Sequence, residues 1–333
     1  MQARRTQLLR KILLNIIRIA ISLGLIVYLI YIADIPQIVA ILKSIDPIGV
    51  ILAALAFVIS VIFLSLRWHL LTRSYGMNIK LVPLFIYYFI GLFFNNFLPT
   101  SIGGDLSRAY YLARESGDRS ASIGTVFLER LMGLLATLSF AFISLFWLMK
   151  YFHSYRIIYL TMIVILVIAL FLASVMSRRI YRKFNGILSL ITFYNVGDKI
   201  IKVFDTLHFY RNKKSILLGT YLYSLLAQFF LIIMNYILAR SLGLLEITFG
   251  YLILVVPITF VIGLLPSING IGVRDSGYLL LLTRLGLQPS EVLSLSFSVT
   301  IIPIFLSLLG GFFVLLYRQK GIASPQLDEE STP

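Results

Sequence analysis

The chain has 333 residues, of which 59% are hydrophobic and 13% are charged. Soluble domains are usually nearer half apolar and a quarter charged, so this composition indicates an integral membrane protein without room for a sizeable soluble catalytic domain. Lys and Arg number 29 against 14 acidic residues, for a formal charge of +15. There is no cysteine and the three histidines are scattered, which excludes disulfides and the usual metal-ligand clusters. We expect neither a metal nor a cofactor.

Apolar segments along the chain predict an all-α polytopic bundle, because a membrane-spanning helix needs about 20 mostly apolar residues. Charge-free stretches occur at 19–33, 48–66, 81–104, 131–149, 157–177, 215–239, 247–273 and 292–317. The first follows a basic segment and lacks a small-residue cleavage site, so we interpret it as an uncleaved anchor. Residues 1–320 are predicted to form one transmembrane domain, and 321–333 a disordered tail.

Loop charges predict the orientation. The N-terminus and the linker 178–214 are rich in Lys and Arg, which places both in the cytoplasm by the positive-inside rule. Apolar residues interleave with basic ones in the linker, which is typical of amphipathic helices lying on an anionic leaflet. An even number of crossings must separate the two cytoplasmic regions, yet five apolar stretches lie between them. One of these stretches therefore enters the membrane and returns.

The segment 81–120 is the best candidate for this re-entrant hairpin. Its helix is broken by Pro99 and by the Gly103-Gly104 pair, and Arg108, Arg114 and Arg119 follow. Broken backbone at membrane depth is tolerated only inside protein or beside a wet cavity. The simpler alternative is an ordinary span followed by an outer loop that contains arginines.

A second break resembles the first. The sequence LPTSIGGDLSR at 98–108 compares with LPSINGIGVRD at 265–275. The predicted topology makes the second hairpin enter from outside, so we expect an inverted repeat with halves at about 48–150 and 215–318, as in many transporters. Chance similarity is the alternative, since Pro and Gly are common in membrane helices. The predicted hairpin hinges are Pro99, Gly103, Gly104, Pro266, Gly270 and Gly272.

Charged residues beside these apolar stretches indicate a polar site, because a charge at the centre of a membrane helix costs about 2.5–3.5 kcal/mol on insertion scales. We expect Arg108 and Arg274, one from each hairpin, to form a cationic site that Glu129 balances when no ligand is bound. Arginine suits phosphate because its planar fork donates two parallel hydrogen bonds. The alternative is structural: Arg–Asp pairs that only lock the hairpins. Candidate substrate-binding residues are Arg108, Arg274, Asp105, Asp275, Glu129, Arg130, Asn96, Ser101, Ser267 and Asn269.

Two further expectations concern neighbours of these residues. Glu129 and Arg130 are adjacent on one helix and point to different sides, so each needs a partner on another helix. Asn95 and Asn96 precede the first break and are expected to hydrogen-bond the carbonyls that the break leaves free.

A family resemblance rests on three runs of sequence. FFNNFLPTSIGGDLSRAYYLARESG, SASIGTVFLERLMGLL and LLPSINGIGVRDSGYLLLLTRLGL resemble the transmembrane domain of lysylphosphatidylglycerol synthases, a family that includes the multiple peptide resistance factors and standalone flippase-like proteins. The resemblance extends from about residue 10 to 318. It implies that the domain moves lipid from the inner to the outer leaflet, although some members are tied to lipid-linked sugar pathways. Full-length synthases carry a soluble aminoacyl-transferring domain, so we expect translocation without synthesis here.

The leading hypothesis is therefore a flippase, rather than an enzyme, in a bacterial or archaeal plasma membrane. Its cargo would be an anionic phospholipid, an aminoacylated phospholipid or a polyprenyl-phosphate-linked headgroup, with no nucleic-acid partner; a homo-oligomer or a partner synthase is compatible with the sequence. Without a nucleotide-binding motif, the drive must come from an ion gradient or the lipid's own gradient. Asp105, Glu129 and Asp275 are the candidate proton-coupling carboxylates. The alternatives are a membrane enzyme acting on lipid-linked substrates and a lipid-binding scaffold.

Overall fold

The computed structural model describes residues 34–97, 102–151, 205–263 and 272–319, together with positions 159, 162, 163 and 166. Throughout these ranges the ordered elements are helices and none is a strand, which confirms the predicted all-α membrane fold. The predictions for 19–33, for most of 157–177, for 178–204 and for the tail at 321–333 lie outside the described residues.

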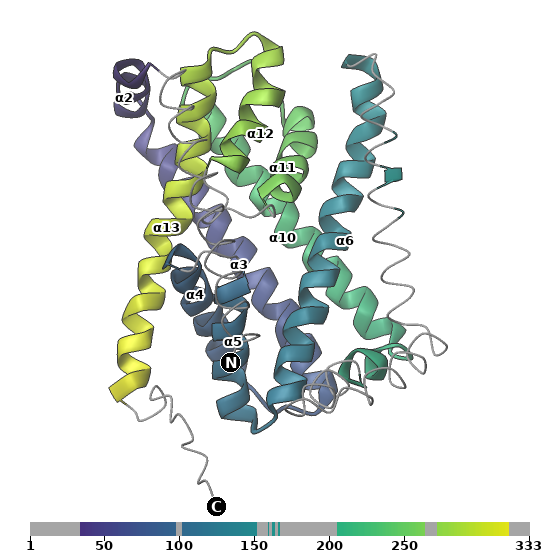
Figure 1. The fold of residues 1–333 in the computed structure, drawn as a ribbon. Coiled ribbons are helices and arrows are strands. Elements are labelled where there is room, and N and C mark those ends of the chain that lie inside the picture. Colours follow the sequence, from purple (N-terminus) through teal and green to yellow (C-terminus); the bar gives the residue numbers. More distant parts are fainter. Residues whose placement is uncertain are drawn as a thin grey trace, which may run out of the picture.

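Four helices of the described chain are long and apolar enough to cross a membrane, and they run along the length of the molecule (Figure 1). They correspond to the stretches predicted at 48–66, 131–149, 215–239 and 292–317. Their observed bounds are α3 Pro47–Tyr75, α6 Arg119–Tyr151, α10 Lys214–Ser241 and α13 Pro289–Gln319.

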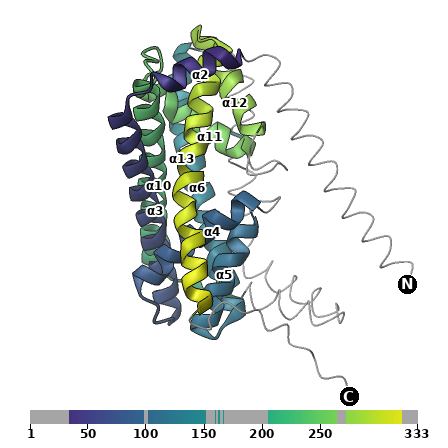
Figure 2. The same cartoon turned by 90° about the vertical axis from the view of Figure 1, so that its left-hand side faces the viewer.

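Two pairs of shorter helices lie between the long ones. In Figure 1, α4 (Leu81–Phe97) and α5 (Ile102–Ser116) occupy the lower half, and α11 (Phe249–Gly263) and α12 (Val273–Leu282) the upper half; Figure 2 shows the same division. A 3-10 turn, Thr283–Leu285, follows α12. The predicted breaks at Pro99, Pro266 and Gly270 lie outside the described residues. The expected break at Gly103-Gly104 is wrong, because α5 begins at Ile102 and continues through both glycines. Re-entry into the membrane stays a prediction. A short helix, α2 (Ile35–Lys43), lies across the upper end in Figure 2.

Capping residues explain where the two central helices begin and end. Asp46 accepts hydrogen bonds from the backbone N–H groups of Ile48 and Gly49 at 3.1 Å, and Pro47 starts α3 with a favourable φ. Gly76 ends α3 at a φ of 101°, and Gly243 follows α10 at a φ of 75°. Both glycines adopt the left-handed conformation in which glycine avoids the steric cost of a Cβ.

The helices α3 and α10 form a tight antiparallel pair. At its middle the Ser60 hydroxyl donates to the Ala227 carbonyl at 2.9 Å, between residues that are 167 positions apart. At one end the Asp46 N–H donates to the Ser241 carbonyl at 3.1 Å. Small residues on the facing sides allow this close approach, which membrane helices use because lipid provides no hydrophobic drive for association.

The other end of the α3–α10 pair has a related hydrogen bond, in which the donor lies at the start of α10 and the acceptor on α3. There the Lys213 ammonium donates to the Ser74 carbonyl at 2.6 Å. Lys213 follows Asp46, and Ser241 follows Ser74, by the same 167 positions that separate the central contact. The sequence of a long, two short and a long helix likewise occurs twice. An inverted repeat predicts such a pattern, although the repeat itself remains a prediction.

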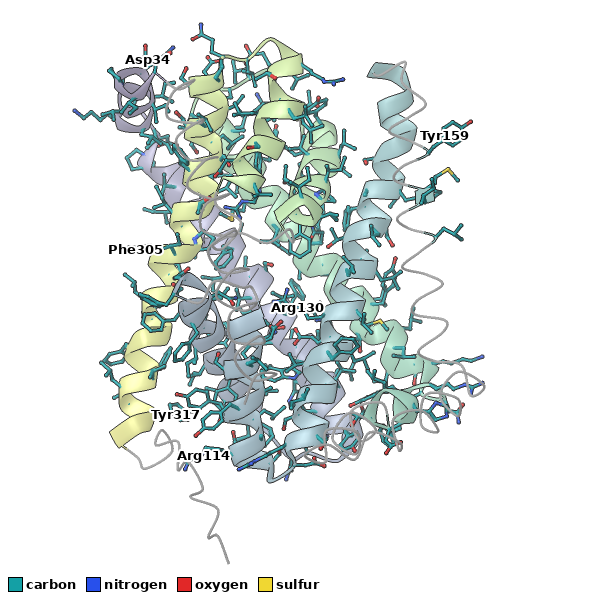
Figure 3. All side chains as sticks on the ribbon, in the orientation of Figure 1. Asp34, Arg114, Arg130, Tyr159, Phe305 and Tyr317 are labelled. Carbon is teal, nitrogen blue, oxygen red and sulfur yellow. The ribbon has the colours of Figure 1, made fainter. Side chains whose placement is uncertain are left out.

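Large apolar side chains lie both inside and outside the bundle. Trp68, Tyr87 and Tyr278 are among the largest side chains that are fully buried. On the outward face of α13, Phe305 is 70% exposed and points away from the bundle (Figure 3). A surface of this kind suits a lipid solvent rather than water.

Candidate functional site

A buried carboxylate joins three helices in the lower half of the bundle. The Glu129 side chain on α6 is fully buried, and it accepts hydrogen bonds from Arg67 on α3 and, at 3.0 Å, from Nη1 of Arg108 on α5. The expectation that Glu129 has partners on other helices is therefore confirmed. A buried charge is tolerated only when it is paired and hydrogen-bonded, and here both oxygens of one carboxylate are used.

A second carboxylate extends the network. Asp105 on α5 accepts from Arg108, one turn later, and from Nε of Arg130 on α6. Arg108 thus links the two acids, and Arg130 also has the partner on another helix that was expected. We call Arg67, Asp105, Arg108, Glu129 and Arg130 the charge cluster. Three arginines against two carboxylates give it a net charge of +1.

The charge cluster is closed at one end and accessible at the other. The Glu129 side chain has no exposed area, whereas the Asp105 side chain is 14% and the Arg130 side chain 36% exposed. Figure 3 places Arg130 on α6 beside α5, about halfway along the long helices. The cluster is therefore buried at Glu129 and partly exposed at Asp105 and Arg130.

Aromatic and hydroxyl groups line the buried end. The Arg108 guanidinium lies 4.2 Å from the ring centre of Tyr88 and 5.2 Å from that of Trp68, within the range of cation–π attraction. Arg67 donates to the hydroxyl of Ser224 on α10 at 3.0 Å and to that of Tyr88 at 3.3 Å. These contacts fix the orientation of both guanidinium groups.

Glycines make room for the arginines where helices cross. A Cβ on Gly104 would lie 2.2 Å from the Gly91 carbonyl oxygen, and a Cβ on Gly91 would lie 2.7 Å from Cγ of Arg108. The Asn95 side chain accepts a hydrogen bond from the Gly104 N–H at 2.8 Å. The amide oxygen of Asn95 thus serves an N–H group at the N-terminus of α5, where helices present donors that need acceptors. Hydrogen bonds from Asn95 and Asn96 to the carbonyls of the break stay a prediction, because residues 98–101 lie outside the described residues. Asn96 donates to Ser307 of α13 at 2.7 Å.

The second hairpin makes different contacts. Arg274 on α12 donates to the hydroxyl of Thr300 on α13. Asp275 accepts from the Gly272 N–H at 2.8 Å and from the Ser296 hydroxyl. Arg108 and Arg274 share no partner among the described residues, so their joint action in one site stays a prediction.

Sequence reasoning missed Arg67. It follows the charge-free stretch 48–66 directly, at the point where the predicted span ends. The helix continues to Tyr75, with the buried Trp68 and Leu71 beyond the arginine, so the charge lies inside the bundle. An apolar pattern that continues past a charged residue is the signal that would have found it.

Some of the other predicted site and hinge residues lie within the described part of the chain, and others lie outside it. Gly103 lies in the first turn of α5, and Gly272 caps α12 at a φ of 82°. Pro99, Ser101, Pro266, Ser267, Asn269 and Gly270 lie outside the described residues. No group of three or more His, Cys, Asp or Glu side chains that could hold a metal occurs within the described ranges.

Comparison with known proteins shows archaeal relatives. A UPF0104 membrane protein of Methanocaldococcus jannaschii is 25% identical over 313 residues, which cover 86% of this chain and 89% of the relative. A UPF0104 membrane protein of Pyrococcus horikoshii is 25% identical over 329 residues, covering 92% and 98%. A third, from Methanothermobacter thermautotrophicus, is 26% identical over 273 residues, covering 75% and 79%.

The family assignment covers nearly all of the fold described above. The pattern of the lysylphosphatidylglycerol synthase TM region matches residues 15–311, a range that includes both hairpins and the whole charge cluster. The resemblance identified from the Leu-Pro, Glu-Arg and Gly-Val-Arg-Asp runs is thereby confirmed. The chain belongs to the family of the lysylphosphatidylglycerol synthase TM region, which is linked to the handling of membrane lipids.

Proposed function

We propose that the protein is a flippase that moves a lipid with a phosphate-containing headgroup between the leaflets of a cell membrane. The charge cluster carries this proposal, because its five side chains hold a surplus positive charge between three helices of an otherwise apolar bundle. Keeping such a surplus among apolar helices is costly unless an anion binds there. The guanidinium fork of Arg108 matches the oxygens of a phosphate.

The network allows Arg108 to change partners without leaving a carboxylate alone. When a phosphate takes the place of the two acids at Arg108, Glu129 keeps its pair with Arg67 and Asp105 keeps its pair with Arg130. Removing one partner from a buried ion pair usually costs 3–5 kcal/mol, so this redundancy lowers the cost of releasing Arg108. In the empty site the two carboxylates occupy the positions at Arg108 that the lipid phosphate takes when it binds.

The two hairpins supply a route to each leaflet. In this mechanism α4–α5 opens toward the cytoplasmic leaflet and α11–α12 toward the outer one. Arg274 receives the phosphate on the second hairpin. Alternating opening of two related segments around a central site is the usual arrangement of inverted-repeat transporters.

Partners and location follow from the same proposal. The protein would lie in the plasma membrane with its N-terminus and the linker 178–214 in the cytoplasm. Its ligand would be an anionic phospholipid, an aminoacylated phospholipid or a polyprenyl-phosphate-linked lipid. It would change the position of the lipid and none of its covalent bonds.

The test is lipid movement in proteoliposomes. Fluorescent or isotopically labelled lipids of the three classes are compared for wild type, Arg108→Ala, Arg108→Lys and Arg274→Ala, with Arg73→Ala as the control because Arg73 is exposed on the same helix as Arg67. We expect movement to fall at least tenfold in both alanine variants, since a phosphate pair lost from a buried site costs more than 1.4 kcal/mol. Arg108→Lys should move lipid at an intermediate rate, because it keeps the charge and loses the fork.

Each outcome has a clear meaning. Movement of one lipid class that disappears in the alanine variants and persists in Arg73→Ala supports a flippase and identifies its cargo. Undiminished movement in folded Arg108→Ala and Arg274→Ala protein assigns the arginines to structure alone. A wild type that moves none of the three lipids contradicts the proposal, and covalently altered lipid would indicate an enzyme instead.

A further inference from the structure

Asp275 is a buried carboxylate that forms no ion pair with any of the described residues. The residue is 2% exposed, at the start of α12. Its two oxygens accept hydrogen bonds from the Gly272 N–H and from the Ser296 hydroxyl, which are neutral donors. Among the described residues no lysine or arginine forms a salt bridge with it, although Arg274 is its neighbour in sequence.

The other acids of the bundle interior differ from Asp275 in this respect. Asp105 pairs with Arg108 and Arg130, and Glu129 pairs with Arg67 and Arg108. Asp275 has no such ion pair among the described residues, and the two hydrogen bonds that it accepts come from neutral donors.

The groups that face Asp275 from the neighbouring helices are neutral or directed elsewhere. On its own helix, Arg274 donates to Thr300 and Tyr278 donates to Asn235 of α10 at 2.6 Å. The packed helix α11 contains no charged residue, and its one tyrosine, Tyr251, donates to the Leu281 carbonyl. The charged residues of α13 and α10 lie near the ends of those helices.

Ser296 suits a carboxyl group that gains and loses a proton. A serine hydroxyl donates to an ionised carboxylate, and after rotation of its hydrogen it accepts from a protonated one. Both protonation states of Asp275 therefore keep a hydrogen bond to the same oxygen without movement of either helix.

In the predicted repeat, Asp275 and Ser296 are equivalent to two residues of the charge cluster, Arg108 and Glu129. Asp275 and Ser296 are 21 residues apart, as are Arg108 and Glu129. Each member of the second pair follows its counterpart in the first by the 167 positions seen at the contact of Ser60 and Ala227. At equivalent positions, one half of the molecule holds an arginine paired with an acid, and the other holds an acid paired with a hydroxyl.

We propose that Asp275 is a proton-binding site that couples the movement of lipid to a proton gradient. This inference rests on the proposed flippase function, and it assigns the two hairpins different ligands: an anionic headgroup at α4–α5 and a proton at α11–α12. In the predicted topology α11–α12 opens to the outside, so protons enter at Asp275 and move inward as lipid moves outward.

The first test does not depend on lipid transport. Infrared spectra of the purified wild type, Asp275→Asn and Asp46→Asn proteins are recorded at neutral pH, and the spectrum of each variant is subtracted from that of the wild type. Asp46 is the matched control because it also caps a helix but is exposed, and asparagine caps equally well. We expect one protonated-carboxyl band in wild type that is absent from Asp275→Asn and unchanged in Asp46→Asn. An ionised Asp275 in wild type would overturn the proposal.

The second test imposes a pH gradient on proteoliposomes at zero membrane potential. With one proton exchanged per lipid, the final ratio of labelled lipid between leaflets shifts about tenfold per pH unit in wild type and in Asp46→Asn. The ratio in Asp275→Asn should not respond to the gradient, whatever its rate of movement.

The outcomes separate this proposal from the flippase function. Lipid movement in wild type with no response to the pH gradient, or with a response only to a sodium gradient, overturns proton coupling and leaves the flippase intact. A wild-type response that survives in Asp275→Asn also overturns it. Absence of any lipid movement contradicts the flippase, and the infrared result then decides whether Asp275 binds a proton.

Discussion

Glu129 stabilises the first half of the bundle by pairing with two arginines at once. Its carboxylate contacts Arg67 and Arg108 from helices on either side, and none of the three side chains is more than 7% exposed. Charges buried to this degree depend on each other, because water is not available to solvate the one that is left.

The loss of this carboxylate is therefore expected to be costly. Glu129→Gln keeps the size of the side chain but leaves two buried arginines with less opposing charge. We expect the free energy of unfolding in detergent to fall by about 3–5 kcal/mol, as is usual when one partner of a buried ion pair is removed. Denaturant or thermal unfolding of the purified protein measures this change.

A control and a double variant make the measurement specific. Glu246→Gln changes an exposed acid and should alter stability by less than about 0.5 kcal/mol. Adding Arg67→Gln to Glu129→Gln should cost less than the sum of the single changes, because the two residues contact each other. If the losses of stability in Arg67→Gln and Glu129→Gln simply add, the interaction between the two side chains does not contribute to stability.

The side chains of the charge cluster were predictable to different degrees. Asp105, Arg108, Glu129 and Arg130 were found because a charge in an apolar segment needs a partner. Arg67 was not found, because a span defined as a charge-free stretch ends at the first charged residue, before the helix itself ends. The partners themselves could not be predicted, because sequence spacing fixes neighbours on one helix and says nothing about which helices meet.

At the scale of helices, the first hairpin depends on a close contact between α4 and α13. A Cβ on Gly310 would lie 2.0 Å from the carbonyl oxygen of Phe89, which is backbone and cannot move aside. Asn96 and Ser307 form a hydrogen bond between the same two helices. The position of α4 beside α13 therefore requires glycine at this point.

Gly310→Ala is expected to push these helices apart. Overpacking of a filled interior costs about 1–3 kcal/mol, and here the obstacle is the main chain. The matched control is Gly219→Ala, where the new Cβ would meet only the terminal Cδ2 of Leu70, which can rotate away. Unfolding curves for both variants give the comparison, and equal stability of the two would contradict the assigned contact.

Within the described residues, the predicted helices agree with the observed ones in order more closely than in length, and the short helix α2 was not predicted. The stretch predicted at 48–66 is a helix from Pro47 to Tyr75, and that at 131–149 begins at Arg119. Hydropathy marks the part of a helix that lipid can solvate. Backbone hydrogen bonding continues into polar sequence until a cap such as Gly76 ends it.

At the scale of the whole molecule, the orientation in the membrane remains a prediction that the ends of the hairpins can test. The turn that follows α5 is predicted to face the cytoplasm, and the turn that follows α12 the outside. The chain contains no cysteine, so single cysteines can be introduced without removing any native ones. Arg114 and Arg284 lie near these two turns.

Labelling with a membrane-impermeant maleimide should therefore distinguish the two positions. In intact cells we expect the Arg284→Cys variant to react and the Arg114→Cys variant to react only after the membrane is opened. Denatured samples of both variants control for buried thiols. Labelling of Arg114→Cys from outside would exclude the re-entrant arrangement of α4–α5, because an ordinary span would then connect the two faces.

The net charge of the charge cluster determines how the proposed flippase should respond to voltage. Three arginines and two carboxylates leave one positive charge, and a bound phosphate monoanion cancels it. A membrane potential acts on an elementary charge with about 2.3 kcal/mol per 100 mV. We therefore expect the loaded cluster to reorient electroneutrally, while the empty one is drawn toward the negative side of the membrane. A negative cell interior would then return the unloaded site to the cytoplasmic leaflet.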